Sequence, residues 1–419
     1  MASSFVSRGF SLTKTSPLFL CRRSSSLSGL SPVRHTSSLD PISRSVLFGS
    51  VSGRPRTPLL CRGFSKGVAG DDEGFWNNAQ NLLQENKIED AVQELQRGLE
   101  EHKHSLLLIS RLADIHMATG QYDKVVEVCD QALELGIGER DGFLALQGEA
   151  YDRLKNFDKA REKYEEVLQR NPNNALIAQR LAFLLLHATD WTEYPKYHKH
   201  KPVVAAFDRC LELARDDPEN HYGRGLAFYH GEEFEQAIEN FKEATDLDPK
   251  YAPAWQKMSL AHIVRKEFEQ SIYAADRFFD TFKDYYSKLS VDLTFGIDAV
   301  LFGLMLKRAL CYLMLKDYRM VIGSMESLLE AGKDIPTKVK TEALLLQSQA
   351  HFEEGGFWEC VKFSSDCIKL DKESYSAYKL RSEAYEALGR TSSAEEDRTM
   401  CLRLAGRRIM PEEEEEQKE

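Results

Sequence analysis

A pair of short amphipathic helical segments recurs along this chain. Three stretches can be written one under another, FLALQGEAYDRLKNFDKAREKYEEVLQRNP (143–172), NHYGRGLAFYHGEEFEQAIENFKEATDLDP (220–249) and SAYKLRSEAYEALGRTSSAEEDRTMCLRLAG (376–406). In each, apolar residues recur at the spacing of one helix face, a short turn follows, and a second such helix completes the unit. One hairpin of this kind cannot cover its own apolar face, so the sequence predicts a row of hairpins that share one continuous core.

Small residues recur at two fixed positions, one in each helix of the unit. They are Gly148, Gly225 and Ser382 in the first helix and Ala160, Ala237 and Ala394 in the second. Large aromatic residues such as Tyr151 and Tyr164 stand beside them, and Pro172 and Pro249 follow the second helix, where proline ends a helix. This pattern resembles the tetratricopeptide repeat, a helix–turn–helix unit of about 34 residues.

The resemblance extends through most of the chain. Weaker copies begin at residues 75, 108 and 175 and near Trp255, Met305 and Leu344, which makes about nine units. The units predict an all-α fold, and the resemblance implies a right-handed α-solenoid with a concave groove lined by the first helices. We expect repeats 1–6 over 72–285, a connecting helix or linker over 286–301, and repeats 7–9 over 302–408.

The fourth unit contains an insertion between its two helices. Its second helix is expected at VVAAFDRCLELARDDP (203–218), so a loop is predicted over 188–202, which includes WTEYPKYHKHKP. Pro195 and Pro202 agree with a loop, and extra residues in such a turn cost little loop-closure entropy. We interpret the stretch as a solvated loop that packs Trp191 against its neighbours, and a contact with another protein stays open.

A metal site and an RNA contact are two other interpretations of the insertion. As a metal site, the insertion would use His198 and His200 as ligands, with His187 as a third. No cysteine or carboxylate lies at a familiar ligand spacing from them. As an RNA contact, the insertion would use the lysines Lys196, Lys199 and Lys201 together with its aromatic residues. The sequence favours the loop over both.

Residues 1–64 differ in composition from the rest of the chain. They are rich in serine and proline and hold eight arginines and Lys14 against the single acid Asp40. This composition predicts a disordered organelle transit peptide that is removed after import. The start MASS and the scattered prolines favour a plant protein imported into the chloroplast stroma; the excess of arginine and the stretch CRGFSKG leave the mitochondrial matrix as the alternative.

The remainder of the chain is strongly acidic. Residues 65–419 hold 46 basic and 65 acidic side chains, a net charge of −19, which repels phosphate backbones and argues against nucleic-acid binding. The most apolar window, 300–315, is interrupted by Lys307 and Arg308, so no membrane span is expected. The final stretch, 409–419, contains EEEEE and is expected to be a disordered acidic tail.

The sequence contains no motif typical of a catalytic or cofactor-binding site. No phosphate-binding glycine loop, nucleophile elbow or metalloprotease motif is present, so we expect no enzyme activity, no cofactor and no metal. The six cysteines after residue 64 contain no CxxC pair, and Cys210, Cys360, Cys367 and Cys401 occupy helix positions where other units carry small residues. The six are Cys129, Cys210, Cys311, Cys360, Cys367 and Cys401. We interpret them as small buried side chains in a reducing compartment.

Binding is the function that remains. In the tetratricopeptide family the groove is lined by a few fixed positions of each first helix, and the resemblance carries these positions over to this sequence. The candidate groove residues are Trp76, Gln80, Ser110, Asp114, Glu149, Asp152, Gln179, Phe183, Tyr222, Tyr229, Gln256, Gln349, Lys379 and Glu383. Their mixed character fits an extended or helical peptide held by apolar anchors and side-chain hydrogen bonds.

Family members that bind Hsp70 and Hsp90 tails use lysine, asparagine and arginine at fixed groove positions. The corresponding positions here hold Ala145, Glu149, Gln179, Phe183, Tyr222 and Leu226, so this carboxylate clamp is absent. The sequence therefore predicts a non-catalytic adaptor that holds a protein or peptide, in the assembly of an organellar complex. The alternatives are an organellar RNA-binding repeat protein and a co-chaperone that lacks the clamp; the oligomeric state stays open.

Overall fold

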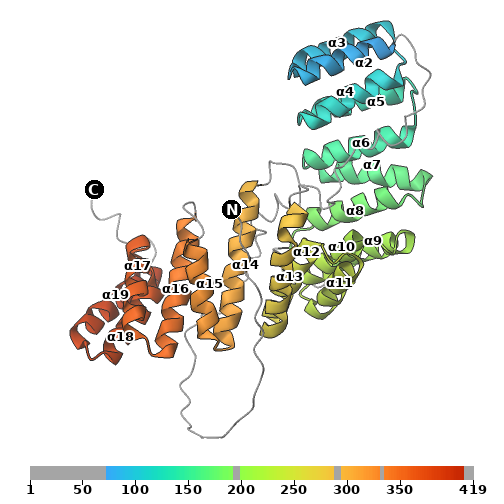
Figure 1. Ribbon diagram of the computed structural model, residues 1–419. Coiled ribbons are helices and arrows are strands. Elements are labelled where there is room, and N and C mark those ends of the chain that lie inside the picture. Colours follow the sequence, from blue (N-terminus) through green and yellow to red (C-terminus); the bar gives the residue numbers. More distant parts are fainter. Residues whose placement is uncertain (1–71, 192–198, 287–293, 331–334, 410–419) are drawn as a thin grey trace, which may run out of the picture. The chain divides into compact units, whose positions relative to one another are not determined.

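The computed structural model describes residues 72–191, 199–286, 294–330 and 335–409, and the structural statements below concern these ranges. Their secondary structure is entirely helical: eighteen α-helices and no strand (Figure 1). The helices form nine consecutive hairpins. They are α2 (Asp72–Gln84) and α3 (Ile88–Glu101); α4 (Leu106–Ala118) and α5 (Tyr122–Glu134); α6 (Arg140–Arg153) and α7 (Phe157–Arg170); α8 (Ala175–Ala188) and α9 (His200–Leu213); α10 (Pro218–His230) and α11 (Phe234–Leu247); α12 (Ala252–Val264) and α13 (Phe268–Tyr286); α14 (Thr294–Met314) and α15 (Tyr318–Glu330); α16 (Thr337–Glu354) and α17 (Phe357–Leu370); α18 (Tyr375–Ala387) and α19 (Thr391–Ile409).

Contacts between helices follow the order of the chain. Each helix packs on the next one, and the first helices also contact one another, as α8 with α10, α10 with α12 and α16 with α18. This is the contact pattern of stacked hairpins that each lean on their neighbours. It confirms the predicted all-α fold of about nine hairpins.

The small residues lie where the helices cross. A side chain at Gly148 would meet the ring of Tyr164, at 2.5 Å from its Cβ position, and one at Gly225 would meet the ring of Phe241 at 2.6 Å. Ala160 and Ala237 are fully buried in the facing helices. The interpretation of these positions as close helix crossings is confirmed.

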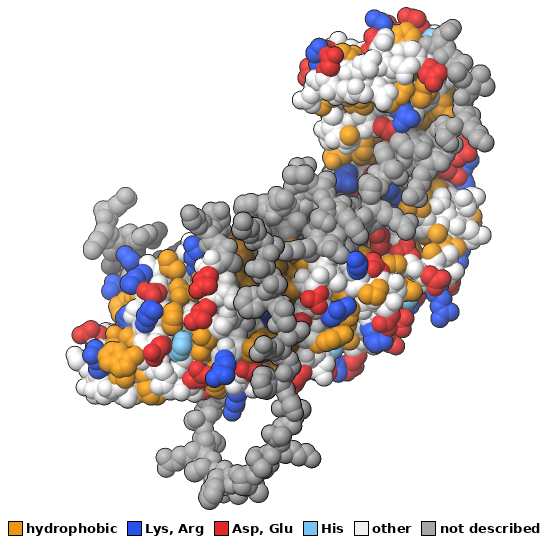
Figure 2. Space-filling model, viewed as in Figure 1, with side chains coloured by type: hydrophobic (Ala, Val, Ile, Leu, Met, Phe, Trp, Pro, Cys, Tyr) orange, Lys and Arg blue, Asp and Glu red, His pale blue; other side chains and the backbone are white. Residues whose placement is uncertain are grey.

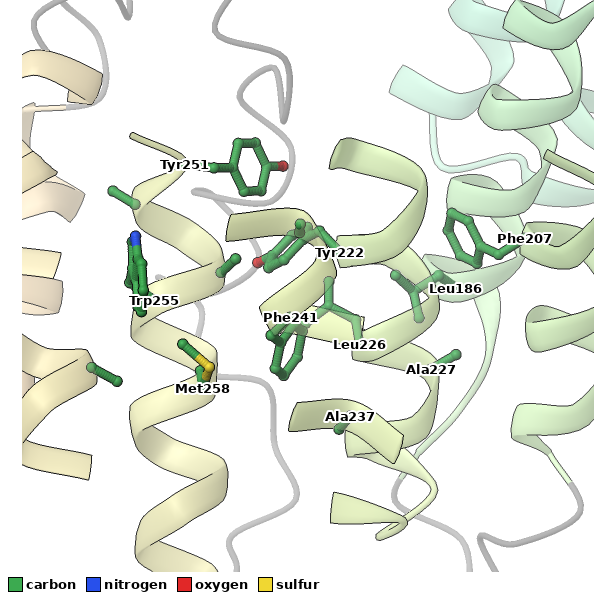
Figure 3. Packing of buried hydrophobic residues seen from close by; sticks show 14 of the residues in the cluster. Leu186, Phe207, Tyr222, Leu226, Ala227, Ala237, Phe241, Tyr251, Trp255 and Met258 are labelled. Carbon is green, nitrogen blue, oxygen red and sulfur yellow. The ribbon is translucent and has the colours of Figure 1, made fainter. Parts of the chain in front are cut away.

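A large core cluster joins hairpins 4 to 7. Phe207 and Phe241, from second helices, are fully buried beside Tyr222 and Leu226 of α10 and Met258 of α12 (Figure 3). Because these side chains come from consecutive hairpins, the core is continuous from one hairpin to the next.

The insertion in hairpin 4 is shorter than predicted. Helix α8 ends at Ala188, but α9 begins at His200, three residues before the predicted start. Pro202 is the third residue of α9, where its missing N–H would have no helical partner in any case. Trp191 is 4 % exposed, its indole N–H donates to the carbonyl of Leu186 at 3.1 Å, and its ring stacks on His230, so the predicted packing of this side chain is confirmed.

Other predicted segments fall partly or wholly outside the described residues. The transit peptide (1–64), the insertion residues 192–198, the segment 287–293 and the tail residues 410–419 are among these. Residues 294–301, expected in a connecting helix or linker, form the first part of α14, which is the first helix of hairpin 7. No described helix has the length and apolar character that crossing a membrane requires.

Five hairpin turns place a residue with a side chain in the left-handed region. These residues are Asn86, Lys155, Glu232, Lys266 and Lys316, with φ between 60° and 65°. The equivalent turns of other hairpins use glycine, such as Gly120 and Gly389, which adopts this conformation without a Cβ clash. Asparagine is common in this conformation, but lysine and glutamate are not, so four of the five positions could not be predicted from residue type.

Lys266→Gly is expected to raise the free energy of unfolding by about 0.5–1 kcal/mol, because relief of the left-handed strain outweighs the greater freedom of glycine in the unfolded chain. Urea unfolding followed by circular dichroism measures this change. Glu127→Gly, at an exposed position in the middle of α5, is the control and is expected to lower stability by about 1 kcal/mol. Equal destabilisation by both variants would contradict the account of the turn.

Candidate binding face on the first helices

The first helices of hairpins 3 and 4 are joined by an ion pair. Arg180 on α8 lies 2.9 Å from the carboxylate of Glu149 on α6, and the two side chains are only 12 % and 9 % exposed. Tyr164 of α7 lies against this pair: burial raises the pKa of its hydroxyl, and the positive charge of Arg180 opposes that rise. Glu149 is therefore held by Arg180, which the prediction from sequence did not include.

The predicted groove residue Gln179 links α8 to the start of α10. Its side-chain amide donates to Asp217 and to Asn220, each at 2.9 Å. Asp217 also caps α10 by accepting from the backbone N–H of Glu219. The amide of Gln179 thus fixes the angle between two neighbouring first helices.

The aromatic groove candidates Tyr222 and Phe183 have different surroundings. Tyr222 is 3 % exposed, and its ring lies 5.3 Å from that of Tyr251 and 5.8 Å from that of Phe241 (Figure 3). Phe183 is half-buried, with its ring edge-to-face on Phe207 at 5.0 Å. The structure places Tyr222 in the core and Phe183 at the edge of it.

Tyr229 presents a half-buried ring on α10. It packs edge-to-face on Phe234 at 5.5 Å, and the ammonium of Lys257 on α12 lies 5.9 Å from its centre. Burial raises the pKa of Tyr229, and its neutral hydroxyl can donate a hydrogen bond. Gln256, also half-buried, precedes Lys257 on α12, and α12 contacts α10. An aromatic ring and an ammonium group therefore meet between these two first helices, and Gln256 adjoins the ammonium-bearing residue on α12.

The candidates in hairpins 1 and 2 are partly covered. Trp76 is half-buried beneath the guanidinium of Arg111, 4.8 Å from its ring, and Arg111 also pairs with Asp114 at 3.4 Å. Ser110 is buried and its hydroxyl donates to a carbonyl of its own helix. Gln80 is exposed on α2.

The remaining candidates lie on three other first helices. Asp152 is half-buried on α6 and Gln349 is half-buried on α16. Lys379 and Glu383 lie one turn apart on α18, with 3.9 Å between their charged groups and both side chains more than 40 % exposed. They form a weak surface pair.

We use the name central face for eight side chains on the first helices α6, α8, α10 and α12. They are Glu149, Asp152, Gln179, Arg180, Phe183, Tyr229, Gln256 and Lys257.

The positions that would form a carboxylate clamp offer no cation. Ala145 and Leu226 are buried, and Tyr222 lies in the core. Glu149 is negative and paired with Arg180. A chaperone tail would meet no basic side chain at these positions.

The histidines near the insertion have internal partners. His200 is 3 % exposed, and its Nε2 lies 3.0 Å from the carboxylate of Glu233. His230 stacks on Trp191. In the part of the chain that the structure describes, no group of three or more His, Cys, Asp or Glu side chains could hold a metal ion; His198 lies outside it.

The six predicted cysteines are all buried and unpaired with one another. Burial raises the pKa of their thiols, to about 12 for Cys210, and Cys360 contacts the hydroxyl of Ser348 at 3.3 Å. Their interpretation as small buried side chains is confirmed. A thiol kept neutral in this way reacts slowly, because the thiolate is the nucleophile.

A thiol reagent at pH 8 is therefore expected to leave these six cysteines unmodified in the folded chain and to modify all six in denaturant. The measurement uses the full chain with Cys21 and Cys61 replaced by serine, since neither lies in the described residues. Rapid labelling of any of the six without unfolding would contradict the burial seen here.

The chain is an all-α protein of stacked helical hairpins, and the central face lies on the first helices of four neighbouring hairpins. Family models described as tetratricopeptide repeat match residues 82–136, 142–174 and 218–251. The chain therefore contains tetratricopeptide repeats, as the sequence pattern predicted. The matched residues cover hairpins 2, 3 and 5 and part of hairpin 1.

The chain is also similar to parts of larger proteins. It is 24 % identical over 175 residues to the human protein O-mannosyl-transferase TMTC1, covering 41 % of this chain and 19 % of that protein. It is 20 % identical over 212 residues to the wheat (Triticum aestivum) Hsp70-Hsp90 organizing protein, covering 44 % and 36 %. The chain thus spans less than two fifths of the length of these relatives.

Among solved structures, a tetratricopeptide repeat protein from Parabacteroides merdae covers 75 % of this chain and 98 % of its own, with 12 % identity and a TM-score of 0.38.

Proposed function

We propose that this chain is a non-catalytic scaffold that binds a protein or peptide on the central face. The observation that carries the proposal is the contact between the half-buried ring of Tyr229 on α10 and the ammonium of Lys257 on α12, with the half-buried Gln256 next to Lys257 in the same helix. A tyrosine ring, an amide and an ammonium on a rigid support recognise apolar side chains, backbone amides and carboxylates respectively. Rigid support lowers the entropy that binding must overcome.

The internal bonds of the central face support a binding role. Arg180 and Glu149 hold α8 on α6, and Gln179 holds α10 on α8. These contacts fix the spacing of successive first helices before any partner arrives. The face is therefore preorganised, which is what repeated recognition of one partner requires.

Two other functions have less support. The name of the wheat relative suggests work with Hsp70 and Hsp90, but the clamp positions here are buried, neutral or acidic. Nucleic-acid binding needs a basic surface. Outside the grey residues, the surface shown in Figure 2 intersperses acidic and basic side chains, and residues 65–419 carry a net charge of −19.

We further propose that the scaffold acts in the assembly of an organellar complex, in the chloroplast stroma or, as the alternative, in the mitochondrial matrix. The basic, serine-rich composition of residues 1–64 supports import. Proximity labelling in intact cells, with the native N-terminus kept, tests compartment and neighbours together. Labelling confined to cytosolic proteins would remove the import proposal.

The binding face is tested by the same labelling with a matched pair of variants. Tyr229→Ala combined with Gln256→Ala removes two groups of the central face, whereas Tyr273→Ala removes a 61 % exposed ring from the second helix α13. The proposal expects the first variant to lose the specific neighbours of the wild-type chain and the second to keep them. Neighbours that survive the central-face variant and disappear with Tyr273→Ala would move the binding site to the second helices.

A further inference from the structure

The acidic charge of the first six hairpins lies mainly on their second helices. The helices α3, α5, α7, α9, α11 and α13 together hold 23 acidic and 11 basic side chains, a net charge of −12. The first helices α2, α4, α6, α8, α10 and α12 hold 7 acidic and 6 basic side chains, a net charge of −1. The central face therefore lies on helices that are almost neutral as a set.

The central face itself carries equal numbers of charges of each sign. Its acids are Glu149 and Asp152, and its cations are Arg180 and Lys257. Glu149 and Arg180 are bound to each other at 2.9 Å and are almost buried, and the ammonium of Lys257 lies over the ring of Tyr229. A partner with a row of like charges would find few opposite charges here, and burying its own charges against this face would cost free energy.

Three apolar side chains lie on consecutive first helices of this region. Phe183 on α8, Tyr229 on α10 and Leu260 on α12 are each half-buried and pack on the core cluster that joins hairpins 4 to 7. Because the core holds them in place, apolar side chains of a partner can pack on their exposed parts with little loss of freedom in the scaffold. Gln256, one turn before Leu260 on α12, offers an amide that both donates and accepts hydrogen bonds.

The charge of the second helices discriminates between kinds of partner. A basic segment is attracted more strongly to the second helices than to the central face, and an acidic segment is repelled by them on approach. A segment without net charge is subject to neither effect, so burial of its apolar surface decides where it binds. The central face suits this third kind of segment.

We infer that the central face binds a peptide segment with a net charge near zero and several apolar side chains. These side chains pack on Phe183, Tyr229 and Leu260, and a backbone amide of the segment bonds to the side chain of Gln256. A single carboxylate beside Lys257 fits this description, whereas a run of like charges does not. The inference rests on the proposed function and adds the chemistry of the partner to it.

Selection from a phage-displayed library of random peptides tests the chemistry of the partner. The peptides are about twelve residues long, which gives an extended length of about 40 Å, and the bait is the folded full chain. Each selected peptide is then tested on the chain with Tyr229→Ala and Gln256→Ala, the central-face variant, and on Tyr273→Ala as the control. The peptides that the central-face variant loses and the control keeps are expected to be enriched in apolar residues and to have a mean net charge within about one unit of zero.

Salt dependence is a second measurement on the same peptides. The dissociation constant of a synthetic selected peptide is expected to change less than about threefold between about 0.05 and 0.5 M NaCl, because salt screens only charge. Oligolysine is the charged probe, and its binding is expected to weaken more than about tenfold over that range and to be equal for the wild type and the central-face variant. Oligolysine binding that is lost with Tyr229 and Gln256 would place a basic partner on the central face and overturn the inference.

The outcomes of the selection separate this inference from the proposed function. Peptides that depend on Tyr229 and Gln256 but share a net charge of about three or more of one sign would overturn the inference and leave the proposed function standing. If every selected peptide binds the central-face variant as tightly as the wild type, the proposed binding face is wrong, and the inference is wrong with it.

Discussion

Phe207→Ala is expected to lower the free energy of unfolding by about 3–5 kcal/mol, because it empties a fully buried site between two hairpins. The ring of Phe207 lies under Gly223, where an added Cβ would come within 2.2 Å of it, and edge-to-face on Phe183 at 5.0 Å. The ring fills the space that the glycine leaves, so the site cannot collapse without moving α10 towards α9. Urea unfolding followed by circular dichroism measures the loss.

Leu247→Ala serves as the control for this prediction. Leu247 is 42 % exposed at the end of α11, so its truncation is expected to change the free energy of unfolding by less than about 0.5 kcal/mol. A loss for Phe207→Ala no larger than that for Leu247→Ala would mean that hairpins 4 and 5 do not share the core described here.

Arg381→Met is the second change with a large expected effect, a loss of about 3–5 kcal/mol in the free energy of unfolding. Arg381 on α18 makes two parallel hydrogen bonds to Asp397 of α19, at 2.8 and 2.7 Å, and a third to Ser365 of α17 at 3.0 Å. The side chain of Asp397 is 6 % exposed. Removing the guanidinium leaves a buried carboxylate without its partner, which costs far more than the pair itself contributes.

Two further variants separate this effect from a general loss of charge. Adding Asp397→Leu to Arg381→Met removes the stranded carboxylate and is expected to recover most of the lost stability. Arg398→Met breaks exposed pairs with Glu395 and Glu386 and is expected to cost less than about 1 kcal/mol. If Arg381→Met and Arg398→Met cost the same, the buried pair does not lock the last hairpins.

The same arrangement recurs in hairpin 5, which shows why the sequence could predict the fold. Arg224 on α10 donates to Asn240 of α11 at 2.7 Å and to Asp208 of α9 at 2.8 Å; its partners lie sixteen residues before and after it, as Ser365 and Asp397 do for Arg381. In stacked hairpins each helix packs on the next, so a period visible in three segments predicts which helices are neighbours in all nine hairpins. The crossings at Gly148 and Gly225 were predictable for this reason.

The details that the sequence did not predict depend on departures from the period. The start of α9 was placed three residues too late because Pro202 suggested a loop, although proline fits the first turn of a helix. The left-handed Lys266 carries no residue-type signal. On the central face, Arg180 was missed because the groove positions were chosen by register alone, and register does not show that Glu149 pairs across to the next first helix.

Register alone also did not predict that Tyr222 is buried. Its position in α10 matches a groove position of the family, yet its ring turns into the cluster with Tyr251 and Phe241. Position along a helix indicates a face only to within about one residue, and an aromatic side chain near the edge of a face can lie on either side of it. Tyr229, two turns further along, keeps a half-buried ring.

The central claim is that a partner binds on the central face. Hydrogen–deuterium exchange of the full chain, with and without a protein captured by the wild type and lost by the Tyr229→Ala and Gln256→Ala variant, tests it most directly. The account predicts that the partner slows exchange in α8, α10 and α12 and leaves the second helices α9, α11 and α13 unchanged. Slower exchange confined to those second helices, with the first helices unchanged, would contradict it.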